Sequence, residues 1–258
     1  KVSQAASEWQ NRPLESLYMI VWMDGIVFKV RENGKVINKT VYLCVGLNKE
    51  GLKEVLGMWV GKNESAAFWM GVLTDLKARG VEDILITVTD NLNGFTETIK
   101  SVFPTSTTQI CVVHQIRNSC RYVVWKEKKE FTSDLKNIYN APTKEAAKME
   151  LENFEQKWGT KYPYAIRSWR NNWEELTVFF DFPVEIRKII YTTNLIENLN
   201  GKIRKYTKNK LSFPNDDALK KSVYLAITEI EKKWYQPIWN WALIFNQFIT
   251  IFENRIQV

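Results

Sequence analysis

The chain has very little of the two residue types that most often carry nucleophilic and zinc chemistry: one histidine and three cysteines among 258 residues. Three cysteines make no disulfide framework, which favours a reducing setting. A serine or cysteine hydrolase would depend wholly on His114 as its base. A zinc site built from Cys111, His114 and Cys120 would lack a clear fourth ligand. We therefore expect Cys111 and His114 to have a structural or positioning role and not a catalytic one.

Signal peptides, repeats, low-complexity segments and long apolar runs are also missing. The longest apolar stretch, residues 239–252, is interrupted by Asn246 and Gln247 and is too short and polar to span a bilayer. These absences favour a cytoplasmic protein without a membrane partner. The chain opens at Lys1 and not at Met, so we expect a fragment of a longer protein.

Positive charge and tryptophan are abundant. The chain has 36 Lys and Arg against 29 Asp and Glu, a net charge of +7, and a pI near 9.1. This balance favours a polyanionic partner, most often nucleic acid. Of the 11 tryptophans, we expect most in the core and some stacked on bases or DNA ends.

The first half of the chain reads as an antiparallel meander followed by alternating helices and strands. The Asn33-Gly34 pair between two β-rich runs is a strong hairpin signal. We predict strands over 18–31, 36–47, 55–60, 84–88 and 108–112. We predict helices over 64–79 and 92–102 and from residue 113 onward.

This element order resembles that of the ribonuclease H fold, an α/β class with a mixed sheet. A right-handed crossover then places the fourth strand beside the first. Asp24 lies on the first strand and Asp90 at the end of the fourth, so the fold would bring them side by side although 66 positions separate them. The domain organisation that we predict is a lead-in (1–17), the first part of the core (18–127), an all-helical insertion (128–190), and a helix carrying Glu197 with two further C-terminal helices (191–258).

The segment 191–210 contains one acid, Glu197, followed by five cations. On a helical wheel, Leu195, Leu199, Ile203 and Tyr206 form one apolar stripe. The opposite face carries Asn194, Glu197, Gly201, Arg204 and Lys208. A carboxylate that can hold a metal, beside cations that can hold phosphates, suits phosphodiester chemistry on DNA. The cations of this segment are Lys202, Arg204, Lys205, Lys208 and Lys210.

Each of these residues also has a simpler interpretation. Asn194 and Glu197 fit a capping box at the start of a helix. Aspartates at strand ends are often turn or cap residues, although Asp24 before Gly25 inside a β-rich run needs a partner or a role. A basic helix is often only a solvated face.

Several segments together resemble the DDE transposases of the Mutator-like bacterial insertion-sequence family, over roughly residues 17 to 235. The matching segments are 21–31 around Asp24, 45–59, Trp69 to Val81, Thr89-Asp90, Cys111 to Asn118, and 192–204 around Glu197.

The resemblance implies that Asp24, Asp90 and Glu197 are catalytic metal ligands for two Mg²⁺ ions, for which Mn²⁺ substitutes. It also implies that Arg204 contacts DNA phosphate and that Cys111-x-x-His114 lies near the active site. The partners implied are double-stranded DNA, both element ends and target, and a second copy of the chain in a homodimer. No small-molecule cofactor is expected, and the location implied is the bacterial cytoplasm, with the nucleoid.

The chain departs from the family pattern in two places. The family usually has Asp-Gly-Leu-Lys-Gly at the second carboxylate, whereas this chain has Asp90-Asn-Leu-Asn-Gly94. An N-terminal helical DNA-binding region is absent from this sequence.

The activity implied is DNA cleavage at element ends followed by transfer of the 3′-OH into target DNA. One alternative is a ribonuclease H-like nuclease or resolvase that uses only water as nucleophile. Another is a non-catalytic DNA-binding protein that retains the fold.

Overall fold

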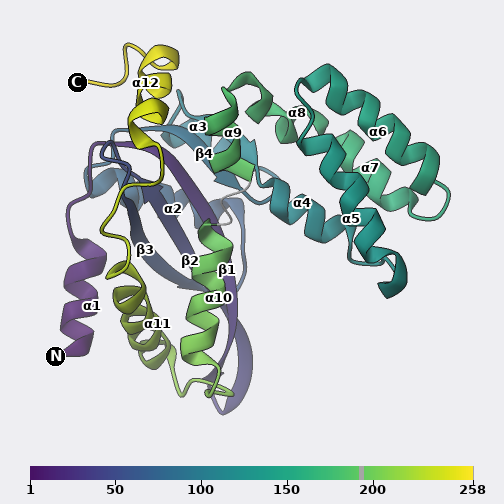
Figure 1. Ribbon diagram of the computed structural model, residues 1–258. Coiled ribbons are helices and arrows are strands. Elements are labelled where there is room, and N and C mark those ends of the chain that lie inside the picture. The colour runs from purple at the N-terminus through teal and green to yellow at the C-terminus, as the bar shows by residue number, and fades with distance from the viewer. Residues whose placement is uncertain (192–194, 258) are drawn as a thin grey trace. The chain divides into compact units, whose positions relative to one another are not determined.

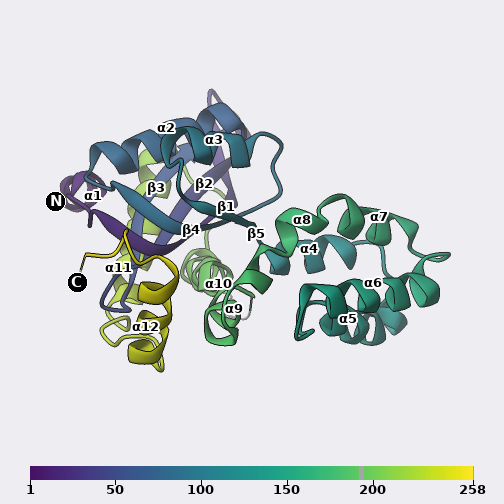
Figure 2. The ribbon, with the colours of Figure 1, turned by 90° about the horizontal axis from the view of Figure 1, so that it is seen from above.

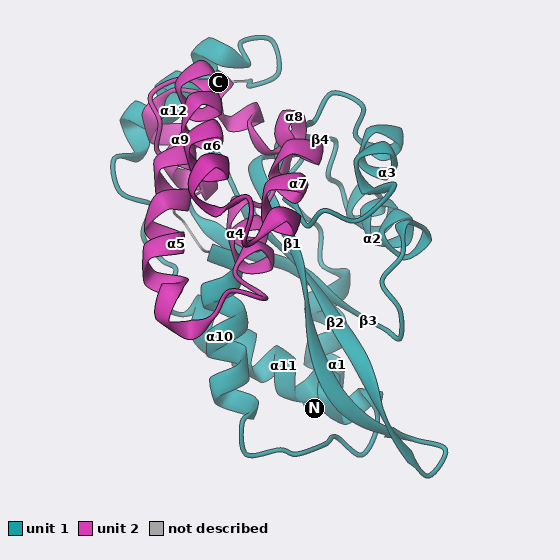
Figure 3. Ribbon diagram, turned by 90° about the vertical axis from the view of Figure 1, so that its right-hand side faces the viewer, with its two compact units in different colours: residues 1–108, 194–258 teal, residues 109–193 magenta. Residues whose placement is uncertain are grey.

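The computed structural model describes residues 1–191 and 195–257 and divides the chain into two compact units (Figure 3). The first, here called the core unit, combines Lys1–Thr108 with Asn194–Val258. The second, the helical unit, is Gln109–Thr193. The helical unit therefore interrupts the sequence of the core unit.

Five strands form one mixed sheet in the order β3-β2-β1-β4-β5 (Figure 1). Their bounds are β1 (Leu17–Glu32), β2 (Lys35–Leu47), β3 (Lys53–Gly61), β4 (Asp83–Thr89) and β5 (Thr107–Ile110). β1 and β2 pair antiparallel, as do β2 and β3, whereas β4 pairs parallel with β1. The predicted meander and the crossover of the fourth strand to the first are both confirmed, and the protein is of the mixed α/β class.

The hairpin between β1 and β2 turns at Asn33 and Gly34. Their φ angles are 49° and 74°, the left-handed pair that a type I′ turn needs and that Asn-Gly supplies at low cost. Glu32 pairs with Lys35 directly across the turn, so the turn residues set the register of the whole ladder.

Helices cover both faces of the sheet in the core unit. Figure 2 shows α2 and α3 on one face and α10 on the other. α10 contacts β1 and α11 contacts β3. The helices of this unit are α1 (Val2–Asn11), α2 (Ala66–Ala78), α3 (Phe95–Val102), α10 (Leu195–Thr207), α11 (Asp216–Glu231) and α12 (Trp241–Ile251).

The main core lies between the sheet and the α2–α3 layer. Val21 and Met23 of β1 and Tyr42 of β2 pack there against Trp69 and Phe95, whose rings stack with centroids 4.8 Å apart. Val21 and Met23 alternate with Asp24 along the strand, so the side chain of Asp24 leaves the sheet on the α10 side. One face of β1 thus packs into the main core, and the other face carries Asp24 toward α10.

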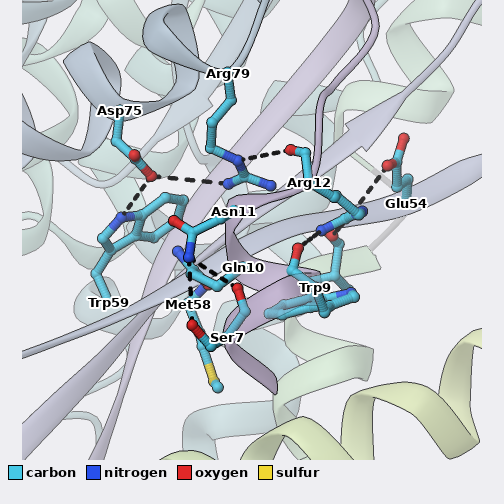
Figure 4. A network of polar contacts seen from close by, with 11 residues as sticks. Ser7, Trp9, Gln10, Asn11, Arg12, Glu54, Met58, Trp59, Asp75 and Arg79 are labelled. Carbon is cyan, nitrogen blue, oxygen red and sulfur yellow. Dashed lines mark hydrogen bonds and ion pairs between the residues drawn. The ribbon is translucent and has the colours of Figure 1, made fainter. Parts of the chain in front are cut away.

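A polar network ties α1 to the sheet and to α2 (Figure 4). Arg12 donates to Oε1 of Glu54 on β3 at 2.9 Å, and its carbonyl accepts from Nε of Arg79 at 3.0 Å. Gln10 accepts from the backbone N–H of Met58 at 2.9 Å. The polar lead-in expected before the first strand is therefore a helix anchored on the β3 edge.

The helical unit consists of helices only, apart from the end of β5. Its elements are α4 (Val112–Ser119), α5 (Trp125–Tyr139), α6 (Lys144–Trp158), α7 (Pro163–Asn171), α8 (Trp173–Leu176), the 3₁₀ helix η1 (Val178–Asp181) and α9 (Val184–Tyr191). Trp169 of α7 donates to Oγ of Ser119 at 2.8 Å, so α4 packs within this unit. The compact unit thus begins at Gln109, whereas the sequence placed the start of the helical segment at 128.

None of the helices within residues 1–191 and 195–257 is long and apolar enough to cross a membrane. All three cysteines are unpaired and buried.

Candidate functional site

Asp24, in the middle of β1, lies beside Asp90, which directly follows the last residue of the neighbouring parallel strand β4. The β1–β4 ladder pairs Trp22 with Val88, and each aspartate lies two residues further along its strand direction. A carboxylate oxygen of Asp24 and one of Asp90 lie within 4.8 Å of one another. Two negative charges this close repel each other unless a cation or a shared proton lies between them.

Both carboxylate oxygens of Asp24 accept hydrogen bonds. Oδ1 accepts from the backbone N–H of Gly25 at 2.7 Å, and Oδ2 accepts from Nδ2 of Asn200 at 2.6 Å. Only 6% of Asp24 is exposed, so the group is both oriented and largely removed from water. A carboxylate oxygen can accept from more than one partner.

Gly25 leaves no room for a side chain beside this carboxylate. A Cβ at this position would lie 2.6 Å from Cγ2 of Thr40 and 3.3 Å from the ring of Tyr42. The close approach of β2 therefore explains why glycine follows Asp24 inside the strand.

The helix α10, which carries Glu197, contacts β1. Leu195, Leu199 and Ile203 are buried, as the wheel predicted. The prediction for Tyr206 was wrong, because Tyr206 is 57% exposed and Thr207 takes the buried position. The buried stripe of the helix consists of Leu195, Leu199, Ile203 and Thr207, which follow one another at intervals of four residues.

Glu197 is half-buried and lies one helical turn before Asn200, whose amide contacts Asp24. Residues three apart share a face of a helix, so Glu197 lies on the face of α10 that carries Asn200. It does not join them within 4.8 Å in the described part of the chain. The capping partner expected at Asn194 falls outside the described residues.

No role was predicted for Asn200 from the sequence, although it belongs to this site. It is 9% exposed and lies between the buried Leu199 and Ile203. A polar residue inside an apolar stripe was the available signal, because a buried amide needs a partner.

The five cations after Glu197 are all exposed. Lys202, Arg204 and Lys205 lie on α10, whereas Lys208 and Lys210 lie beyond its end at Thr207. The expectation that Lys208 continues a helical face with Arg204 is therefore wrong. Burial, and then the charge of Lys202, lower the pKa of Lys53.

Cys111 and His114 lie at the start of the helical unit. Cys111 is buried immediately before α4, and His114 is half-buried in its first turn. Cys111, His114 and Cys120 do not bring ligand atoms within 4.8 Å of one another among the described residues. Burial also raises the pKa of Cys120, which disfavours the thiolate that zinc binding requires.

The carboxylate oxygens of Asp24 and Asp90 fit a divalent cation as ligands. Both residues offer carboxylate oxygens, the hard ligands that Mg²⁺ prefers. Asp24 is buried and fixed by two donors, so its metal-facing lone pairs are already oriented. A cation between the two carboxylates would also relieve their repulsion.

The structure defines an α/β protein whose core unit is interrupted in the sequence by a helical unit and carries an acidic pair where the parallel strands β1 and β4 stop pairing. The chain belongs to a transposase family, the Mutator family, whose model matches residues 1–237.

Curated relatives agree with this assignment. A probable transposase for an ISRM3-like insertion sequence element from Sinorhizobium fredii is 44% identical, over 99% of this chain and 64% of that protein. The ISRM3 transposase of Rhizobium meliloti is also 44% identical, over 98% and 64%. A probable insertion-element transposase of Corynebacterium diphtheriae is 41% identical, over 87% and 66%. The chain thus spans less than two thirds of the length of each of these relatives.

Among solved structures, a chain of a simian T-cell lymphotropic virus intasome bound to a PP2A regulatory subunit is 14% identical over 57% of this chain and 50% of that one. Its TM-score of 0.27 is too low to bear on the fold.

Proposed function

We propose that this chain is the catalytic core of a DDE transposase with a ribonuclease H-like fold and a helical insertion. It cleaves DNA at the ends of an insertion element and joins the freed 3′-OH to target DNA. The observation that carries the proposal is the proximity of Asp24, within β1, to Asp90, just beyond the end of the parallel strand β4. The Asn200–Asp24 hydrogen bond supports it by holding the Glu197 helix at the same place.

In this proposal Asp24, Asp90 and Glu197 hold the metal. Two Mg²⁺ ions, or Mn²⁺ in their place, would supply activation of a water or 3′-hydroxyl and stabilisation of the leaving oxygen. Asp24 is fixed on a strand, so its oxygens define the site. Glu197 has a longer side chain and would reach the metal from a helix.

The exposed cations would position the DNA. Lys202, Arg204 and Lys205 follow Glu197 on the same helix, so phosphates bound there lie within a few turns of the carboxylates. Phosphate contacts fix the register of the duplex without reading its sequence. A homodimer on DNA would bring two element ends together.

Strand transfer tests the proposal directly. The substrate is a duplex with an exposed 3′-OH at an element end, and the product is that end joined to a target plasmid in Mg²⁺. Asp24→Asn, Asp90→Asn and Glu197→Gln should each lower the rate by about 10²–10⁴-fold, the usual range for a group acting on the reacting atoms. Asp217→Asn, an exposed acid on α11, serves as the matched control.

The products separate the alternatives. Cleavage without joining of the 3′-end would indicate a nuclease or resolvase that uses only water. DNA binding without either product would indicate an accessory protein, and an unchanged rate in the three variants would overturn the assignment of the carboxylates.

A further inference from the structure

The turn between α4 and α5 of the helical unit is held firmly in place. The backbone N–H of Tyr122 donates to the hydroxyl of Tyr164 at 3.2 Å, and that hydroxyl donates to the carbonyl of Ser119 at 2.7 Å. The N–H of Val124 donates to the hydroxyl of Tyr162 at 3.3 Å. Two tyrosines from another part of the unit thus fix the backbone of this turn.

This fixed turn presents large aromatic rings to solvent. Trp125 is 88% exposed and Tyr122 is 64% exposed. The other three tryptophans of the helical unit, Trp158, Trp169 and Trp173, are buried. Trp125 therefore contributes nothing to the core of the unit, and an exposed tryptophan on a rigid turn indicates a binding surface.

Cations surround the exposed rings. A hollow of about 500 Å³ beside the turn is lined by Arg117, Asn118, Cys120, Arg121 and Lys128. The guanidinium of Arg121 lies 5.6 Å from the ring centroid of Tyr122. Lys126 and Lys129 add two more exposed cations.

The acids of the segment do not neutralise this charge. Residues 117–129 contain one acid, Glu127. Glu127 pairs with Lys161, and the hydrogen bonds from Lys161 and then Tyr162 lower its pKa. Arg121, Lys126, Lys128 and Lys129 form no ion pair in the described residues. The charge of these four residues is thus available to an anionic partner.

We propose that this surface, here called the Trp125 surface (Arg117, Arg121, Tyr122, Trp125 and Lys128), is a second DNA-binding site. Trp125 stacks on an unpaired base next to a duplex, and the cations bind the adjoining phosphates. Aromatic faces flanked by cations suit single strands, because every base has a face for stacking and every nucleotide carries a charge. The site goes beyond the proposed chemistry, since none of its residues belongs to the carboxylate set.

Equilibrium binding in EDTA tests the stacking, with the full chain and two dye-labelled duplexes, one blunt and one with a single-stranded 3′ extension. Trp125→Ala should weaken binding of the extended duplex by about tenfold, within the range for loss of one stacked base. Binding of the blunt duplex should change much less. Trp239→Ala is the matched control, because Trp239 is also 88% exposed but lies in the core unit.

The salt dependence of binding tests the cations. Replacing Arg121 and Lys128 together by Gln should reduce the log–log salt slope by about 2, since each phosphate contact contributes about 0.9. Lys136→Gln with Lys148→Gln removes two exposed cations elsewhere in the helical unit and should leave the slope unchanged.

Three outcomes would overturn the proposal. The Trp125 and Trp239 variants could bind both duplexes equally well, or the two cation pairs could change the slope alike. Alternatively, Trp125→Ala could leave DNA binding intact and abolish self-association in light scattering, which would make the surface an interface between copies. Because EDTA removes the metal, these results do not depend on whether the chain performs strand transfer.

Discussion

The side-chain amide of Asn200 donates a hydrogen bond of 2.6 Å to Oδ2 of Asp24. An ionised carboxylate only accepts hydrogen bonds, so the amide must present its NH₂ group to Asp24. Its oxygen then points elsewhere, and Oδ1 of Asn200 is buried without a partner among the described residues. The helix that carries Glu197 thus fixes one oxygen of Asp24, while the backbone of Gly25 fixes the other.

Asn200→Leu should weaken Mn²⁺ binding about 10–100-fold, the usual effect of losing a residue that orients a metal ligand. Leucine keeps the approximate volume but cannot donate, so Asp24 loses the partner of Oδ2. Electron paramagnetic resonance of free Mn²⁺ measures the affinity directly. Asn200→Ser, which is smaller and polar, provides a second variant if the leucine chain does not fold.

Asn198→Leu is the matched control, because Asn198 is exposed on the same helix. Its Mn²⁺ affinity should equal that of the wild type. Melting temperatures in EDTA show whether Asn200 also supports the fold. An Asn200 variant with wild-type Mn²⁺ affinity would contradict the orienting role, whatever its stability.

Gly25→Ala should destabilise the core unit by about 1–3 kcal/mol, the usual range for overpacking. The added Cβ would lie 2.6 Å from Cγ2 of Thr40, and the strand must shift beside Asp24. Thr40→Ser removes that methyl group, so the double variant should regain part of the lost stability. Chemical denaturation of the four chains gives the coupling; additive losses would show that Thr40 is not the obstacle.

The sheet could be predicted from the sequence because its signals are local. Alternation, the Asn33-Gly34 turn and the short apolar run before Asp90 each specify a strand or a turn by themselves. The handedness of the crossover then placed Asp24 beside Asp90 without any knowledge of side-chain contacts.

The remaining features depend on packing that no local pattern encodes. Tyr206 and Thr207 are adjacent, and the contact line of α10 determines which of them is buried. The hydrogen bond between Asn200 and Asp24 joins two residues that are 176 positions apart in the sequence. α4 belongs to the helical unit because Trp169 donates a hydrogen bond to Ser119. The spacing of apolar residues along the sequence cannot predict such a contact.

Glu231→Gln should stabilise the chain at neutral and alkaline pH and have little effect in acid. Burial raises the pKa of Glu231, so the folded state binds its proton more tightly than the unfolded state does. The stability that this proton provides is complete below the unfolded pKa and is lost as the pH rises through the folded pKa. Glutamine keeps an acceptor for the N–H of Val55, now 2.7 Å from Glu231, without the buried charge.

Denaturation at several pH values checks this, with Glu229→Gln as the control. Glu229 is on the same helix but exposed, and exposed ion pairs such as its pair with Lys232 contribute little. If both variants show the same pH dependence as the wild type, the charge of Glu231 is not the cause.

The cations after Glu197 should make duplex binding strongly dependent on salt. If all five meet phosphates, they contribute about −4 to −5 to the log–log slope. Replacing Lys202, Arg204 and Lys205 by Gln should reduce its magnitude by about 3, and replacing Lys208 and Lys210 by about 2, since each contact contributes about 0.9. A loss confined to the first set would limit the DNA contact to α10, because the last two cations lie beyond Thr207. If both replacement sets leave the slope unchanged, this segment is a solvated face, and the phosphates must be held elsewhere on the chain.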